Sequence, residues 1–157
     1  MNAIVVNVML CAPMKGKTDE EIKASIETLK EQVSNHILQD FKGRNNIGEF
    51  MNDSTVTLKF WDNMVEYKNP TLDPERVIRQ YRMFCLGNGI SNVMPHCNYV
   101  VFGENWWESY GCIIEAITAR SYGMNIVSIN NGEIASDETF NRIIRDTINY
   151  KIENNWM

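Results

Sequence analysis

The fold is decided by residues 97–129, CNYVVFGENWWESYGCIIEAITARSYGMNIVSI. The run at 97–103 is short, apolar and rich in β-branched residues, which is typical of a buried strand. A loop then leads into an apolar helical stretch at 112–122, which Gly123 ends, and 124–129 is a second strand. A strand, a helix and a strand in succession indicate a crossover unit of a parallel sheet.

The same alternation continues along the rest of the chain. Further strands are predicted at 3–10 and 56–60, further helices at 18–38, from Asp73 to Gly87 and Gly89, and from Ser136 or Asp137 onward, and loops at 39–53 and 61–72. Strands and helices alternate four times, so we expect one α/β domain over residues 1–157, with a doubly wound parallel sheet and helices on both faces.

Composition narrows the possible partners. The chain has 157 residues, of which 44% are hydrophobic and 22% charged, as in an ordinary globular domain. Its net charge is −5 and its lysines and arginines are scattered, which disfavours a nucleic acid polymer but leaves a single mononucleotide as a possible ligand. Since no apolar run approaches the roughly 20 residues of a membrane span and the first residues lack basic character, we expect no membrane association and a cytoplasmic location.

The cysteines and histidines indicate no metal site. They share no ligand spacing and contain no CxxC pair: Cys11, Cys85, Cys97, Cys112, His36 and His96. We expect reduced, mostly buried thiols and no metal.

Ligands of open parallel sheets bind beyond the carboxyl ends of the strands, where the loops at 11–17, 104–111 and 130–133 are expected to converge. The first loop, CAPMKGK, lacks the frame of a phosphate-binding P-loop, and is either a plain turn or an anion site before a helix. The candidate substrate or phosphate contacts in this loop are Pro13, Met14, Lys15 and Gly16.

Glu115 is the most informative residue. It lies one turn into an otherwise apolar helix that begins near Ser109 and Gly111, where a hydroxyl and free backbone N–H groups can hold an anion. A buried carboxylate is costly, so Glu115 either pairs with a cation such as Arg120 or belongs to a functional site.

The adjacent tryptophans Trp106 and Trp107 allow two interpretations. They are either packing or dimer anchors, or a platform on which a base stacks.

These residues carry a resemblance. The opening APMKGKTDEEI, the strand NYVVFG at 98–103 and the element SYGCIIEAITARSYG at 109–123 resemble the nucleoside 2-deoxyribosyltransferase-like superfamily, particularly a branch rich in phage proteins. The resemblance implies a flavodoxin-like or Rossmann-like fold, a homo-oligomer (dimer or larger), a nucleoside or nucleotide substrate and no cofactor. For a phage-encoded protein the compartment would be the host cytoplasm.

The resemblance also implies roles for single residues. Glu115, four positions after Gly111, matches the nucleophile that attacks the anomeric carbon and forms a glycosyl-enzyme intermediate. Ser109 stands where transferases carry an aspartate; related 2′-deoxynucleoside 5′-phosphate N-hydrolases carry serine there, which favours a nucleoside 5′-monophosphate. Asn98 stands where many relatives have an aspartate near the base. Either another group protonates the leaving base, with Glu104, Glu108 and Asp62 as candidates, or turnover is slow or absent.

Three functions follow as hypotheses. The first is cleavage or transfer of an N-glycosidic bond of a (deoxy)nucleoside 5′-monophosphate. The second is binding or sequestration of a nucleotide in the same pocket without chemistry, which Asn98 favours. The third is an interaction protein whose Trp106, Trp107 and Trp156 bury at an oligomer contact.

Overall fold

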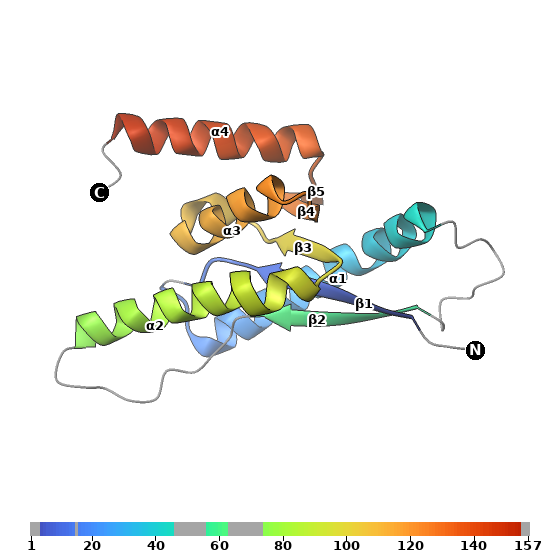
Figure 1. Cartoon of the computed structure of the whole chain (residues 1–157), viewed down its shortest axis with the longest axis horizontal. Helices are drawn as coiled ribbons and strands as arrows, with labels where there is room; N and C mark the ends of the chain where they lie inside the picture. Colours follow the sequence, from blue (N-terminus) through green and yellow to red (C-terminus); the bar gives the residue numbers. More distant parts are fainter. Residues whose placement is uncertain (1–3, 15, 46–55, 63–73, 155–157) are drawn as a thin grey trace.

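Five strands form one mixed sheet in the order β2-β1-β3-β4-β5 (Figure 1). The computed structural model describes residues 4–14, 16–45, 56–62 and 74–154 as a single α/β domain. The strands are β1 (Ile4–Cys11), β2 (Val56–Asp62), β3 (Tyr99–Phe102), β4 (Asn125–Asn130) and β5 (Glu133–Ile134), and the helices are α1 (Asp19–Arg44), α2 (Pro74–Asn88), α3 (Tyr110–Ser121) and α4 (Asp137–Glu153). Short helical turns follow at Gly89–Val93, Met94–His96 and Trp106–Glu108.

The first four strands are parallel, as the alternation of strands and helices predicts. In register, Val8 of β1 lies beside Tyr99 of β3, which in turn lies beside Asn125 of β4. The short strand β5 was not expected and pairs antiparallel with β4. Its cause is local, because Asn131 and Gly132 have φ angles of 54° and 77°, and Asn-Gly is a preferred sequence for tight hairpin turns.

One face of the sheet is covered by α1. The inward side chains of the three central strands pack against one stripe of this helix. The fully buried members of this core include Val6, Val8 and Val101 from the sheet and Val33 and Ile37 from α1. Helical spacing thus places four buried residues of α1 on one side: Ile26, Leu29, Val33 and Ile37.

The opposite face carries the other helices. Its core combines Met9 and Phe102 of the sheet with Trp106, Ile113 of α3 and Phe140 of α4, together with residues that follow α2. Helices therefore cover both faces, as expected, with α1 on one face and α3 and α4 on the other. The β4–β5 hairpin reverses the chain before α4, which then packs on the same face as α3.

Helix α1 is longer than predicted. The polar segment from residue 39 was expected to be a loop, but α1 continues to Arg44. Phe41 packs against the core of the α1 face, and the Tyr99 hydroxyl donates a hydrogen bond to Asp40 at 2.5 Å. These long-range contacts hold the last turns in place; residues 46–53 of the predicted loop lie outside the described residues.

The end of α2 also differs from the prediction. The chain stays helical beyond Gly87 and Gly89, because a π-helical turn and then a 3₁₀ turn follow α2 as far as His96. Phe84, expected on the same helix face as Val77 and Tyr81, is 68% exposed, and the side chains of the other two lie outside the described set. Over the described residues, no helix is long and apolar enough to cross a membrane.

Candidate functional site

The loops beyond the carboxyl ends of β1, β3 and β4 are tied together by hydrogen bonds. The Gly103 N–H donates to the Cys11 carbonyl at 2.9 Å. Both carboxylate oxygens of Glu104 accept from the β4–β5 turn, one from Asn131 N and one from Gly132 N, each at 2.9 Å. The predicted convergence of these loops is therefore present.

Glu115 is buried at this edge, on the face covered by α3. It is 7% exposed and lies among Cys112, Ala116 and other buried residues of α3. The alternative in which Arg120 neutralises it is wrong, because Arg120 extends to Asp137 at 3.6 Å and lies over the Phe140 ring. Within the described part of the chain, Glu115 has no ion-pair partner.

The hydrogen-bond partner of Glu115 is a thiol. Cys11, the last residue of β1, donates its S–H to Glu115 Oε2 with an Sγ–Oε2 distance of 3.1 Å. Burial raises the pKa of the Glu115 carboxyl from 4.5 to about 7, although the hydrogen bond from Cys11 opposes this shift. Burial, with the neighbouring carboxylate, raises the pKa of Cys11 well above its usual value, so this thiol stays protonated.

Ser109 and Gly111 lie beside this carboxyl. Ser109 caps α3, and its Oγ accepts from the Cys112 N–H at 3.4 Å. A Cβ added at Gly111 would lie 3.8 Å from Ser109 Oγ and 4.0 Å from Glu115 Oε1. The structure thus brings three predicted residues together, and with Cys11 we call them the Glu115 cluster.

A separate cavity of about 530 Å³ opens at the same edge on the α1 side. Its lining residues are Ala12, Pro13, Lys17, Ala24, Ser25, Thr28, Leu29, Gln32, Gly103, Glu104 and Gly132. Of the predicted contacts in the first loop that the structure describes, Pro13 lines this cavity, as does Lys17 of the same loop. The Met14 carbonyl accepts from Lys17 N at 3.2 Å, Gly16 is exposed with a φ of 80°, and Lys15 lies outside the described residues.

Trp106 is a core residue. It is fully buried, with its ring centroid 5.5 Å from that of Phe102 and 4.9 Å from that of Phe140. Trp107 is partly buried and meets Trp106 edge-on at 6.0 Å. The packing interpretation therefore holds for Trp106, which presents no free ring face to a base.

Asn98 is not brought to the Glu115 cluster within the chain. It precedes β3, so it lies at the amino edge of the sheet, whereas Glu115 lies beyond the carboxyl edge. Asn98 instead joins backbone groups of β1: its Oδ1 accepts from Asn7 N at 2.9 Å and its N–H donates to Asn7 O at 2.7 Å. The structure therefore does not bring Asn98 close to Glu115, where the resemblance placed it near the leaving base.

The three candidate proton donors lie in different surroundings. Glu104 is engaged by the hairpin turn, as described above, and Glu108 is exposed next to the α3 cap. Asp62 is the exposed last residue of β2, and its side chain is not without a partner. Glu108 is the nearest to the cluster in sequence.

Sequence reasoning missed Cys11 and Leu86. Cys11 was identifiable as the last residue of a buried central strand, a position that meets the neighbouring helix terminus. Leu86 Cδ1 lies 4.0 Å from the Gly111 Cβ position, and no pattern in α2 marks that contact.

The fold and site define a mixed α/β protein with a buried carboxyl, hydrogen-bonded to a thiol, beside a helix cap. Comparisons with protein-family models, curated proteins and solved structures give no match. Among the described residues, no group of three or more histidine, cysteine, aspartate or glutamate side chains is placed to hold a metal ion.

Proposed function

We propose that this protein cleaves or transfers the N-glycosidic bond of a (deoxy)nucleoside 5′-monophosphate, with Glu115 as the nucleophile. The observation that carries the proposal is the burial of Glu115 beside the capped start of α3, with no cationic partner among the described residues. A protein tolerates such a carboxyl at a cost of several kcal/mol, and functional sites are a common reason for it.

The residues of the cluster suit this chemistry. The transition state of N-glycosidic cleavage is cationic at the sugar, so a nearby carboxylate stabilises it and then traps the anomeric carbon. The C–N bond breaks as the C–O bond to Glu115 forms, and the base leaves with the electron pair and takes up a proton. Water or a second base then attacks the same carbon and releases the Glu115 carboxylate.

The phosphate has a proposed place at the start of α3. A helix start attracts anions through its dipole and its unpaired N–H groups. Ser109 adds a hydroxyl, and Gly111 leaves the space beside it free of a side chain. This arrangement favours a nucleotide over an uncharged nucleoside.

We also propose a more specific fold for this α/β domain. The order β2-β1-β3-β4 is that of the flavodoxin-like doubly wound sheet. We propose that the chain is a variant of that fold in which the hairpin with β5 redirects the last helix.

We further propose that the protein forms a homo-oligomer and acts in the cytoplasm. The outer side of α3 exposes Tyr110, Ile114 and Ile117, which supports a contact with a second copy. All four cysteines are free thiols, in keeping with a reducing compartment.

The second candidate is nucleotide binding without chemistry. It is favoured by the raised pKa of Glu115, which leaves the carboxyl largely protonated below pH 7 and able to donate a hydrogen bond instead of attacking carbon. Calorimetry would then show nucleotide binding while no base is released over hours.

The direct test is incubation of the protein with each of the four deoxynucleoside 5′-monophosphates, and with the matching nucleosides, followed by chromatography for free base. We expect release from at least one monophosphate, faster than from its nucleoside, and loss of release in Glu115→Gln. Unchanged release in that variant would remove Glu115 from the mechanism. The control is Glu31→Gln, an exposed carboxyl of α1 outside the cluster.

A further inference from the structure

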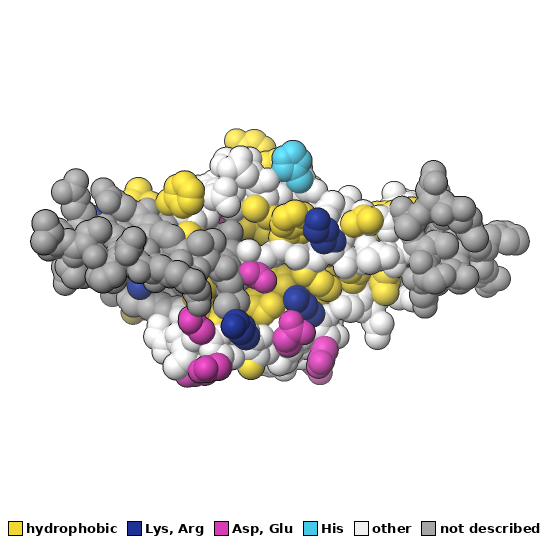
Figure 2. All heavy atoms as spheres, turned by 90° about the horizontal axis from the view of Figure 1, so that it is seen from below, with side chains coloured by type: hydrophobic (Ala, Val, Ile, Leu, Met, Phe, Trp, Pro, Cys, Tyr) yellow, Lys and Arg dark blue, Asp and Glu magenta, His cyan; other side chains and the backbone are white. Residues whose placement is uncertain are grey.

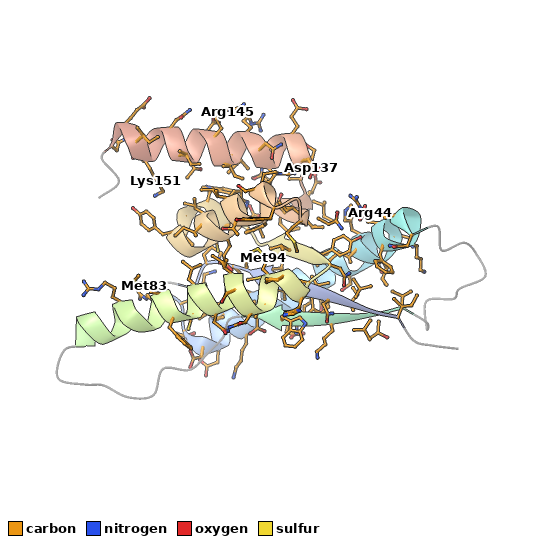
Figure 3. The ribbon with its side chains drawn as sticks, viewed as in Figure 1. Arg44, Met83, Met94, Asp137, Arg145 and Lys151 are labelled. Atoms are coloured by element: carbon orange, nitrogen blue, oxygen red, sulfur yellow. The ribbon has the colours of Figure 1, made fainter. Side chains whose placement is uncertain are left out.

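We propose that Cys11 is a positioning residue for Glu115: its S–H holds one carboxylate oxygen, leaving the other on the side of Gly111. This inference rests on the proposed function for its consequence in catalysis, although the contact itself does not depend on it. Figure 3 shows α3, which carries the carboxyl, lying above the end of α2.

The two oxygens of Glu115 have different surroundings. Oε2 accepts the hydrogen bond from Cys11 Sγ at 3.1 Å. Oε1 lies 4.0 Å from the position that a Gly111 Cβ would occupy, and Leu86 Cδ1 lies at the same distance from that position. The oxygen on the Gly111 side is therefore Oε1, and the thiol decides which oxygen that is.

The position of Cys11 makes this contact rigid. Cys11 is 3% exposed at the end of β1, and its carbonyl accepts a hydrogen bond from Gly103 N at 2.9 Å. Its Cα lies in register with that of Phe102 in β3. A donor fixed by a central strand restricts the rotamers of the carboxyl without adding a positive charge, which would weaken a nucleophile.

A thiol suits this position for a chemical reason. An ammonium or guanidinium group would form an ion pair and hold the carboxylate in its ground state, whereas an S–H is a weak, uncharged donor. The neighbouring Cys112 thiol is also buried on α3, but the structure records no hydrogen bond from it to Glu115, so it serves as a matched control.

The experiment is a carbon-13 NMR titration of Glu115 in protein labelled at the glutamate carboxyl carbons, assigned with Glu115→Gln. In Cys11→Val, which places an apolar residue without a donor in the strand, we expect the titration midpoint to rise by about one pH unit because the ionised form loses its donor. Cys11→Ser restores a donor and should return the midpoint toward that of the wild type. Cys112→Ala should leave it unchanged.

The result that overturns the inference is an equal midpoint in the wild type, Cys11→Val and Cys112→Ala, or an equal rise in both cysteine variants. If Cys11→Val does not fold, the comparison of Cys11→Ala with Cys11→Ser replaces it, and circular dichroism establishes folding. Since the titration requires no turnover, a shift without base release would retain the positioning role and reject the proposed function. Where base is released, the ascending limb of the kcat/KM profile should move with the midpoint.

Discussion

At the scale of single residues, the site depends on one buried carboxyl, for which the described part of the chain supplies no countercharge. The pattern of α3 predicts the burial of Glu115, since its neighbours are apolar almost all round. Its partner was not predictable from that pattern, because Cys11 lies 104 positions away in the sequence. Arg120 was the closest plausible cation in sequence, but the hairpin after β4 places Asp137 within its reach instead.

Glu115→Gln is expected to stabilise the folded protein at alkaline pH. In the folded state the pKa of Glu115 is raised from 4.5 to about 7 by burial, so the folded form binds the proton more tightly than the unfolded form. The free energy of unfolding of the wild type therefore falls between about pH 4.5 and 7 and levels off above. Urea unfolding should show Glu115→Gln to be more stable at pH 8 by up to about 3 kcal/mol, with no such gain near pH 4.5. An equal gain at both pH values contradicts the assignment.

Gly111→Ala should separate stability from binding. The added methyl group makes only ordinary contacts, at 3.8 Å from Ser109 Oγ and 4.0 Å from Glu115 Oε1, and alanine favours helix by about 1 kcal/mol over glycine. Thermal unfolding should therefore show an unchanged or higher Tm. Nucleotide affinity, measured by calorimetry, should fall by about tenfold or more as the methyl group fills the space between the hydroxyl and the carboxyl. Unchanged affinity would place the ligand elsewhere.

At the scale of elements, local sequence patterns predicted the starts of helices better than their ends. The caps Thr18, Ser109 and Ser136 each accept a hydrogen bond from the first turn of their helix, as side-chain caps do. The end of α1 was misjudged because Phe41 and Asp40 are stabilised by contacts with the sheet that no local pattern contains. The strand β5 was missed although Asn131-Gly132 is a hairpin signal, because the segment is too short for strand periodicity.

Tyr99→Phe should loosen the end of α1. The variant keeps the buried ring but removes the hydroxyl that donates to Asp40 at 2.5 Å. We expect a loss of about 1–2 kcal/mol in the free energy of unfolding. Amide exchange should accelerate most between residues 38 and 44, and His36→Ala, at an exposed position of the same helix, provides the control. A uniform acceleration of amide exchange over the whole chain would contradict a local role for the Tyr99–Asp40 hydrogen bond.

At the scale of the whole molecule, one helix shields one face of the sheet. Figure 1 shows α1 on the opposite side of the strands from α3, and the two cores lie on opposite faces. Figure 2 shows apolar side chains between charged groups on one surface of the molecule. The four-fold alternation in the sequence predicted the parallel sheet, but the distribution of helices depends on where α4 docks through Phe140, and that is a property of the assembled core.

Ile37→Ala tests whether the two faces unfold together. Ile37 is a fully buried residue of α1 that faces the sheet, so its truncation should cost about 2–5 kcal/mol. Tryptophan fluorescence, to which the core residue Trp106 on the opposite face contributes, and far-ultraviolet circular dichroism should report the same lowered midpoint. Two separated transitions would show that the faces are independent, and Gln39→Ala, exposed on the same helix, should leave both probes unchanged.

The cavity beside α1 and the Glu115 cluster lie against opposite sides of the same pair of loops. Three of the cavity's polar residues, Ser25, Thr28 and Gln32, come from α1, which contributes no residue to the cluster. Selection can therefore vary that wall without altering the carboxyl or its thiol. The residues of the Glu115 cluster and the α1 wall of the cavity can therefore change independently of each other.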